Sequence, residues 1–178
     1  MKYLALLRGI NVGGKNRLPM KDLVQMFEAA GCTDVQTYIQ SGNVVFRVSP
    51  SKVGKLPGIV GKSIEEKFGY RIPIVIRTPS QLREVLANNP FLRKGASEEC
   101  VHVLFLADTP EVESVSGLDP ARSAPDAFAV CGSEIYLHLP NGAADTKLTN
   151  AYFDSRLKTI CTGRNWRTTL KLLEMMDE

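Results

Sequence analysis

Hydrophobic and polar positions in the first half of the chain follow two repeats, one typical of strands and one typical of helices. Four runs rich in β-branched and aromatic residues predict strands. They cover residues 3–8, 34–39, 43–48 and 72–77. Leu23, Met26 and Phe27 recur at helical spacing and predict a helix over residues 19–30. A second apolar stripe predicts a helix over residues 58–68. The order β-α-β-β-α-β is the ferredoxin-like plan.

The second half repeats this plan with changes. Three strands are predicted, at residues 101–107, 127–131 and 134–139. The last two are joined by a two-residue turn that begins with glycine. Phe153, Leu157 and Ile160 predict a helix over residues 149–162, and Asn165 is suited to cap a final helix. No fourth strand is predicted in this half.

The two halves together predict an α+β fold of two tandem ferredoxin-like subdomains, with mostly antiparallel sheets and extra C-terminal helices. Thr78, Pro79 and Gln81 form a capping box that opens a helix at the junction. We therefore expect a first domain over residues 1–78 (βαββαβ) and a second over residues 79–178 (αβαββαα). Exposed loops are expected at residues 49–56 and 114–126, which are rich in loop-forming residues.

Composition and charge narrow the functional classes. The 178 residues carry a net charge of +3, too small by itself to indicate nucleic acid or a membrane as partner. No apolar run approaches the ~20 residues of a membrane span, and the apolar run before Arg8 lacks the features of a signal peptide. The four cysteines are widely spaced, which favours a reducing, cytoplasmic compartment. Cys131 and Cys161 are expected to be small core residues.

The clearest functional candidate is the glycine-rich segment 8–17, which links the first strand to the first helix. Glycines allow successive backbone N–H groups to converge on an anion. The segment also carries positive charge. Its candidate ligand-binding residues are Arg8, Asn11, Gly13, Gly14, Lys15 and Arg17. A plain structural loop is the alternative.

The segment from Gly9 to Lys15 has the glycine and lysine spacing of a nucleotide phosphate-binding loop, but its context differs. Asn16 stands where a magnesium-binding hydroxyl residue would follow the lysine. Pro19 places the helix start several residues too late, and the expected sheet is antiparallel. We therefore do not expect a nucleoside triphosphatase.

A second candidate is the hairpin around Ser41, Gly42 and Asn43. In the structural interpretation, Gly42 and Asn43 supply turn geometry. In the functional one, Gln40, Ser41 and Asn43 line a polar pocket. We expect this hairpin to leave the sheet at the end opposite the tip of the first strand, so a direct meeting with the glycine-rich segment is not expected.

A third candidate is the Arg164-Asn165-Trp166 motif. In the structural interpretation it is a corner between two helices, with Asn165 as cap and Trp166 packed. In the functional one, Arg164 and Arg167 hold an anion beside a helix N-terminus. His102 and His138 lack a clustered carboxylate, so no metal site is predicted, and no cofactor is predicted either.

These three motifs together resemble the bacterial DUF1697 family. The resemblance rests on Leu7-Arg8-Gly9-Ile10-Asn11-Val12-Gly13-Gly14, on Gln40-Ser41-Gly42-Asn43-Val44, and on Arg164-Asn165-Trp166. It covers nearly the whole chain and implies two ferredoxin-like subdomains. It implies no activity, because the family is one of unknown function.

Three classes of function remain open. The first is binding of a small anionic or phosphorylated ligand at the glycine-rich segment, with or without catalysis. The second is a structural or interaction protein, for example a homodimer. The third is a nucleic-acid-binding module, which is disfavoured because the strand at residues 43–48 offers only Phe46 for base stacking.

Overall fold

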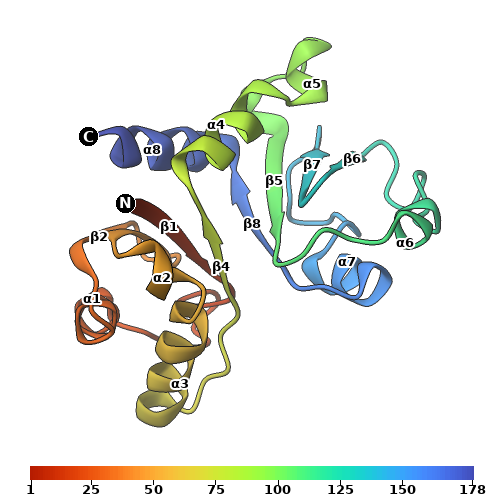
Figure 1. Ribbon diagram of the computed structural model, residues 1–178. Helices are drawn as coiled ribbons and strands as arrows, with labels where there is room; N and C mark the ends of the chain where they lie inside the picture. Colours follow the sequence, from red (N-terminus) through yellow and green to blue (C-terminus); the bar gives the residue numbers. More distant parts are fainter. The chain divides into compact units, whose positions relative to one another are not determined.

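The first-half strands form one four-stranded sheet in the computed structural model, which describes residues 1–178 (Figure 1). The strands are β1 (Lys2–Leu7), β2 (Thr33–Tyr38), β3 (Asn43–Arg47) and β4 (Ile74–Arg77). Their order across the sheet is β2-β3-β1-β4, and every neighbouring pair is antiparallel. This topology confirms the ferredoxin-like plan expected from the sequence.

One face of this sheet carries the apolar core. The covering helices are α1 (Met20–Ala29), α2 (Pro50–Val53) and α3 (Leu56–Phe68). Phe27 of α1 and Phe46 of β3 are fully buried, with ring centroids 5.1 Å apart. Helix α2 lies in the stretch 49–56, where the sequence predicted only a loop. Pro50 occupies the first helical turn, where a missing N–H costs nothing, so a short helix forms in a polar stretch.

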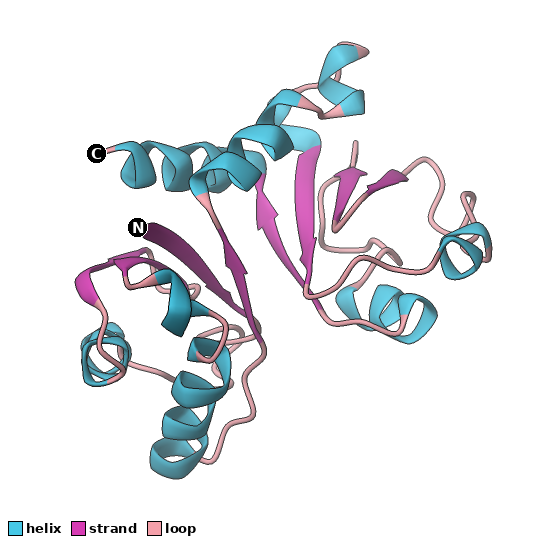
Figure 2. Ribbon diagram, viewed as in Figure 1, coloured by secondary structure: helices cyan, strands magenta, loops and turns pink.

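The second-half strands form a second sheet with the same topology (Figure 2). They are β5 (Val101–Leu106), β6 (Ala127–Cys131), β7 (Glu134–His138) and β8 (Cys161–Asn165). Their order is β6-β7-β5-β8, again antiparallel throughout. Helices α6 (Val112–Ser116) and α7 (Asn150–Leu157) lie next to each other, and the core cluster on this side includes Phe153 and Leu137.

The strand β8 corrects the sequence prediction of a helix over residues 149–162 followed by a helix–helix corner. Helix α7 ends at Leu157 because Lys158 takes a left-handed conformation, φ 55°. Ile160 has the helical spacing that predicted the longer helix, but its side chain is 42% exposed. Gly163 does not stop a helix. It lies within β8, where a Cβ would come within 2.8 Å of Leu104 Cδ2 and the leucine side chain would have to shift.

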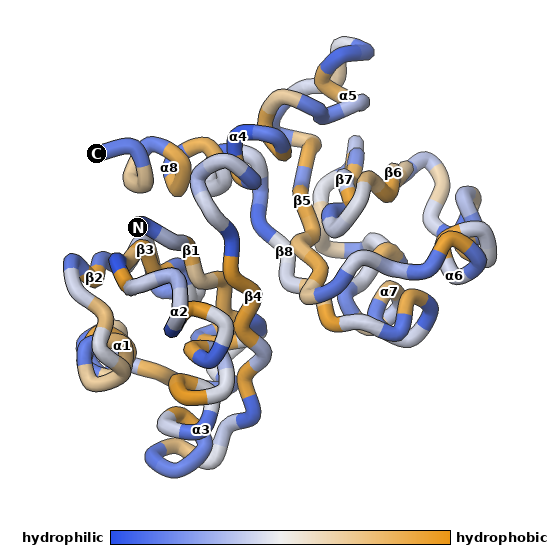
Figure 3. The backbone as a smooth tube through the Cα atoms, viewed as in Figure 1, coloured by the Kyte–Doolittle hydropathy of each residue, from blue (hydrophilic) through white to orange (hydrophobic).

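Two cysteine expectations have different outcomes. Cys161 is buried in β8, as expected of a small core residue. Cys131 is exposed at the end of β6, so its prediction as a core residue is wrong. The reason is that β6 lies at the edge of its sheet, where the pattern of apolar residues does not guarantee burial. Hydropathy is high along β4 and β5, as Figure 3 shows.

Three capped helices follow strands or loops. They are α4 (Pro79–Ala87), α5 (Pro90–Arg93) and α8 (Trp166–Asp177). Thr78 Oγ1 accepts from Gln81 N at 3.2 Å, and Gln81 Oε1 accepts from Thr78 N at 2.9 Å, which confirms the predicted capping box. Asn165 Oδ1 accepts from Thr168 N at 2.8 Å, which confirms Asn165 as the cap of α8. No helix is both long enough and apolar enough to cross a membrane.

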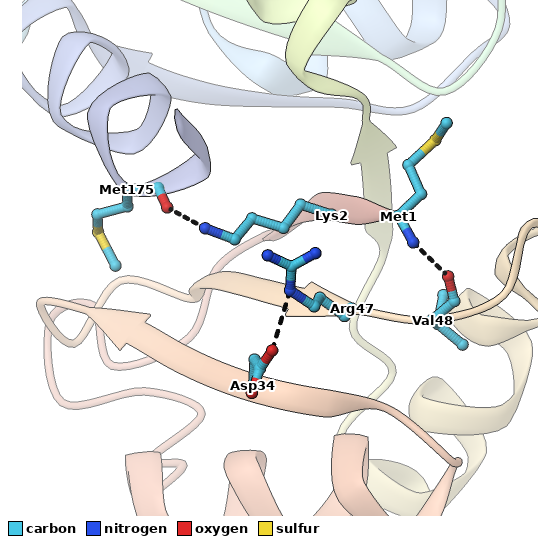
Figure 4. Close-up of polar contacts among 6 residues, drawn as sticks. All are labelled: Met1, Lys2, Asp34, Arg47, Val48 and Met175. Carbon is cyan, nitrogen blue, oxygen red and sulfur yellow. Dashed lines mark hydrogen bonds and ion pairs between the residues drawn. The ribbon is translucent and has the colours of Figure 1, made fainter. Parts of the chain in front are cut away.

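The chain divides into two compact units. One comprises Met1–Leu82 and Leu172–Glu178, and the other comprises Arg83–Lys171. The end of α8 joins the first unit, where Lys2 Nζ donates to the Met175 carbonyl at 3.2 Å (Figure 4). A lysine at this position also suits the negative end of a helix dipole. The domain boundary between residues 78 and 79 stays a prediction.

The registers of the two sheets can be matched position by position. Leu7 N donates to Gly42 O at 2.8 Å, and Leu106 N donates to Ser133 O at the same distance. With Leu7 and Leu106 equivalent, the third position before each one pairs with an arginine. The two sheets are therefore structural repeats of one another, although the sequence showed only a shared order of elements.

The matched arginines are Arg77 in β4 and Arg164 in β8. Both are buried, at 4% and 8% exposure. Each donates through Nη1 to the carbonyl of the residue before it, at 2.9 Å for Arg77 and 2.7 Å for Arg164. Each is followed at once by a helix cap, Thr78 or Asn165. A buried arginine, a cap and a helix thus form a repeated junction.

Candidate functional site

The glycine-rich segment forms a small hairpin of its own between β1 and α1. Val12 and Lys15 form an antiparallel bridge, and Lys15 N donates to Val12 O at 3.0 Å. The two residues between them, Gly13 and Gly14, both have positive φ, 57° and 74°. Two successive left-handed residues make a type I′ turn, which only glycine and a few polar residues adopt readily. The two glycines therefore shape a turn rather than a wrapped phosphate cradle.

Two asparagines hold this small hairpin in place. Asn11 N donates to Asn16 O at 3.1 Å, and Asn16 Nδ2 donates to Gly9 O at 2.9 Å. The Asn11 side chain also bonds to both backbone polar groups of Leu18. Its Oδ1 accepts from Leu18 N at 2.8 Å, and its Nδ2 donates to Leu18 O at 2.9 Å. Asn11 and Asn16 are themselves left-handed, as asparagine tolerates.

The hairpin between β2 and β3 meets this segment directly, which corrects the expectation that the two lie at opposite ends. Asn11 Nδ2 donates to Gln40 O at 2.8 Å. A Cβ on Gly42 would lie 2.7 Å from Leu7 Cβ, so the chains approach as closely as glycine allows. The reason is register: β3 is antiparallel to β1, so Asn43 at its start pairs with Leu6 near the end of β1.

Ser41 and Asn43 face inward at the hairpin turn. Asn43 is fully buried, and its Nδ2 donates to Ser41 Oγ at 2.9 Å and to Tyr38 O at 3.1 Å. These bonds give Asn43 a role in holding the turn. Ile39 in the same turn has φ 49° and is 53% exposed. A positive φ is strained for a β-branched residue.

We call residues 8–17 together with residues 39–43 the loop–hairpin surface. Its charge has one sign. Lys15 and Arg17 are exposed, and Arg8 is half-buried. Residues 1–21 contain no aspartate or glutamate, and residues 35–46 contain no charged residue at all. The next acidic residue, Asp22, is paired with Lys67 at 2.6 Å. The residues of this surface therefore carry positive charge and include no carboxylate.

Arg164 and Asn165 belong to the second unit. Arg164 is held inside β8, where its Nη1 donates to Thr162 Oγ1 at 3.0 Å. Burial lowers the pKa of Arg164 to about 10. Asn165 is exposed, and its side-chain oxygen accepts the hydrogen bond that caps α8. The structure thus gives both residues internal partners.

The chemistry available at the loop–hairpin surface is recognition by charge and hydrogen bonding. Helix α1 begins at Met20, five positions after Lys15, so Lys15 does not sit at a helix N-terminus as in a nucleotide phosphate-binding loop. No group of three or more histidine, cysteine, aspartate or glutamate side chains could hold a metal ion. Only Ser41 offers a nucleophilic oxygen there, and Asn43 donates to it rather than accepting from it.

Sequence reasoning missed the part played by Asn16 and Ile39. From the sequence, Asn16 was only the residue that stands in place of a magnesium-binding hydroxyl. Its left-handed φ of 49° and its bond to Gly9 O make it part of the turn framework. The spacing Asn-x-Gly-Gly-x-Asn was the available signal, since both residue types favour left-handed positions. Nothing in the sequence signals the positive φ of Ile39.

Comparison with known proteins places this arrangement. Residues 1–136 match a family model described as a protein of unknown function, DUF1697. The chain belongs to the DUF1697 family. The matched range contains the whole loop–hairpin surface, and the family description assigns no activity.

One solved structure supports the same fold. It is described as the conserved bacterial protein SP0830 from Streptococcus pneumoniae. The TM-score is 0.71 at 22% sequence identity, over 98% of this chain and 98% of that one. At this identity the similarity shows the DUF1697 chain's fold alone. No curated protein matches the sequence.

Proposed function

We propose that the loop–hairpin surface of this DUF1697 protein binds a small anionic ligand that carries a phosphate or carboxylate group. The observation that carries the proposal is that Lys15 and Arg17 are both exposed. They belong to a surface whose own residues include no carboxylate. Charge-assisted hydrogen bonds from lysine and arginine are the usual means of holding such groups. No reaction is proposed.

The fixed backbone supports this proposal. Asn11, Asn16 and Gly42 hold the two segments together before any ligand arrives, so little ordering entropy is spent on binding. The strained Ile39 points the same way, since strained backbone concentrates at ligand sites. Val12, 62% exposed, and Ile39 add apolar contacts beside the charges. A ligand with an anionic group and a short apolar part fits this surface.

Thermal-shift measurements test the proposal. Inorganic phosphate, pyrophosphate, citrate and nucleotides are each added at an ionic strength matched with sodium chloride. A binder at about 100 times its Kd adds about 2.7 kcal/mol of stability. We expect at least one anion to raise Tm in the wild type and to lose this effect in the double variant Lys15→Ala/Arg17→Ala.

The control is Lys62→Ala, which removes a 75% exposed lysine on α3 of the same unit. This variant should keep the full Tm shift. If no anion stabilises the wild type, or if the double variant responds as the wild type does, the proposal fails.

A protein partner is the alternative, because Val12 and Ile39 expose apolar side chains together. In a homodimer these side chains would be covered, and light scattering across concentrations would show a mass increase that Val12→Ser abolishes. Nucleic acid is less well supported, since Phe46 is fully buried and cannot stack on a base. A cytoplasmic location belongs to this proposal and rests on the four cysteines, none of which forms a disulfide.

A further inference from the structure

A cavity of about 620 Å³ lies in the second unit, among residues of the short 3-10 helix Glu98–Cys100, of β5 and of the start of α8. Its volume falls in the range of small-molecule sites, roughly 300–1,000 Å³. It shares no residue with the loop–hairpin surface. None of the predictions made from the sequence placed Glu98 or Glu99 in a site.

His102 of β5 lines this cavity with an unsatisfied ring. Its Nδ1 is buried and has no hydrogen-bond partner in the protein. A buried nitrogen left in this condition is destabilising, so such atoms are normally hydrogen-bonded in folded proteins. Burial also lowers the pKa of His102 from its ordinary value, which disfavours the charged ring. The ring therefore forms part of the cavity wall, while its Nδ1 is out of reach of solvent.

Charges of both signs line the same cavity without pairing. Glu98 and Glu99 are exposed carboxylates of the 3-10 helix, and Arg167 is exposed on the first turn of α8. None of the three takes part in an ion pair. The N-terminus of α8 adds partial positive charge on the Arg167 side. The lining of the cavity therefore carries both acidic and basic side chains, none of them paired with another.

We propose that this cavity binds a small zwitterion, namely a free amino acid, with its ammonium group at Glu98 and Glu99 and its carboxylate at Arg167 and the start of α8. A purely anionic ligand would meet the two carboxylates, and a purely cationic one would meet the guanidinium. Leu170, 40% exposed on the wall, gives the ligand side chain an apolar surface. This site does not depend on the anion site proposed for the first unit.

Trp166 makes the test specific. It is the only tryptophan of the chain, and it lines the cavity. Tryptophan fluorescence, excited at a wavelength that the five tyrosines do not absorb, therefore reports on the surroundings of this one residue. The common L-amino acids other than tryptophan and tyrosine are titrated up to about 10 mM, the weak limit of specific small-ligand binding. Equilibrium dialysis with labelled amino acids covers binding that leaves the fluorescence unchanged.

Two blocked analogues of the best-bound amino acid decide the charge argument. The N-acetyl form lacks the ammonium group, and the amide lacks the carboxylate. Each should bind at least about tenfold more weakly than the parent. The N-acetyl form leaves the two carboxylates without an opposite charge, and the amide leaves the guanidinium without one. Equal binding of either blocked form would overturn the zwitterion assignment. No saturable binding of any amino acid by either method would overturn the site.

Variants locate the binding. Arg167→Ala and Glu99→Gln change exposed side chains and should leave Tm unchanged, yet each should weaken binding about tenfold or more. The matched control Arg156→Ala removes an exposed arginine of α7 that does not line the cavity. Binding that survives Arg167→Ala, or that falls equally in Arg156→Ala, contradicts the proposal.

Discussion

Gly42 shows how one residue couples two segments of the first unit. It has φ 79°, and a Cβ there would meet Leu7 Cβ at 2.7 Å and Ile10 Cδ1 at 3.0 Å. Both the backbone conformation and the contact exclude a side chain. The residue therefore acts as the point at which the β2–β3 hairpin lies directly against the end of β1.

We predict that Gly42→Ala lowers the free energy of unfolding by about 3 kcal/mol or more, from left-handed strain and overpacking combined. Gly69→Ala is the matched control, because Gly69 has a similar φ of 75° but open space around its Cα. Its cost should be only about 1–2 kcal/mol. Urea unfolding of both variants gives the comparison, and equal losses would show that the Leu7 contact contributes nothing.

His102 gives a pH-dependent prediction. Its pKa is lowered in the folded state by burial, so the unfolded chain binds the proton more readily. The groups that share its cavity are Glu98, Glu99 and Arg167. Above pH 6.5 the histidine is neutral in both states and contributes no pH dependence. As the pH falls through 6.5, the free energy of unfolding should decrease.

His102→Gln should remove this part of the pH dependence, leaving a flatter stability curve below about pH 6.5. Urea unfolding at a series of pH values measures it. A decrease of the same size in wild type and variant would contradict the assignment to His102.

At the scale of elements, Asn11 holds the glycine-rich segment to both α1 and the β2–β3 hairpin. Its side chain makes bonds to Leu18 N, Leu18 O and Gln40 O. We predict that Asn11→Gly, which keeps the left-handed backbone, costs about 1 kcal/mol for each bond lost. Amide hydrogen exchange should show loss of protection at Leu18, whose N–H loses its acceptor.

Asn16→Gly is the control for this prediction. It removes the bond to Gly9 O but leaves the acceptor of Leu18 N–H in place. Protection at Leu18 should therefore persist. Loss of protection in both variants would indicate general loosening of the segment rather than the specific bond.

The sequence predicted elements well where periodicity was long and caps were explicit. The first sheet, its two long helices and the caps at Thr78 and Asn165 follow from local pattern. The prediction failed at β8. This strand has only five residues, Cys161 and Gly163 among them, and their alternation of apolar and polar residues is weaker than the helical spacing just before them. The meeting of the hairpin with the glycine-rich segment depends on strand register, which required working out which ends of antiparallel strands adjoin.

At the scale of the whole molecule, the last seven residues belong with the first unit. Leu172, Met175 and Met176 are nearly fully buried, and Lys2 donates to the Met175 carbonyl. We predict that ending the chain at Lys171 lowers the free energy of unfolding by about 4 kcal/mol or more, given about 1.5–3 kcal/mol for each buried apolar side chain.

A chain that lacks only Asp177 and Glu178 is the control, since both are exposed. Its unfolding in urea should be close to that of the full chain. If ending the chain at Lys171 has no greater effect than this shorter deletion, the terminal segment does not stabilise the first unit.

The repeated junction at Arg77 and Arg164 shows that the two units share one plan, and this bears on the stoichiometry of ligand binding. A fold built from two copies of one plan offers two equivalent places for a ligand, one after β1 and one after β5. The second copy has diverged in charge: Ala107 and Asp108 stand where the first has Arg8 and Gly9, and Glu111 follows. An anion held after β1 would be repelled after β5. The anion site proposed for the first unit should therefore saturate at a single equivalent per chain.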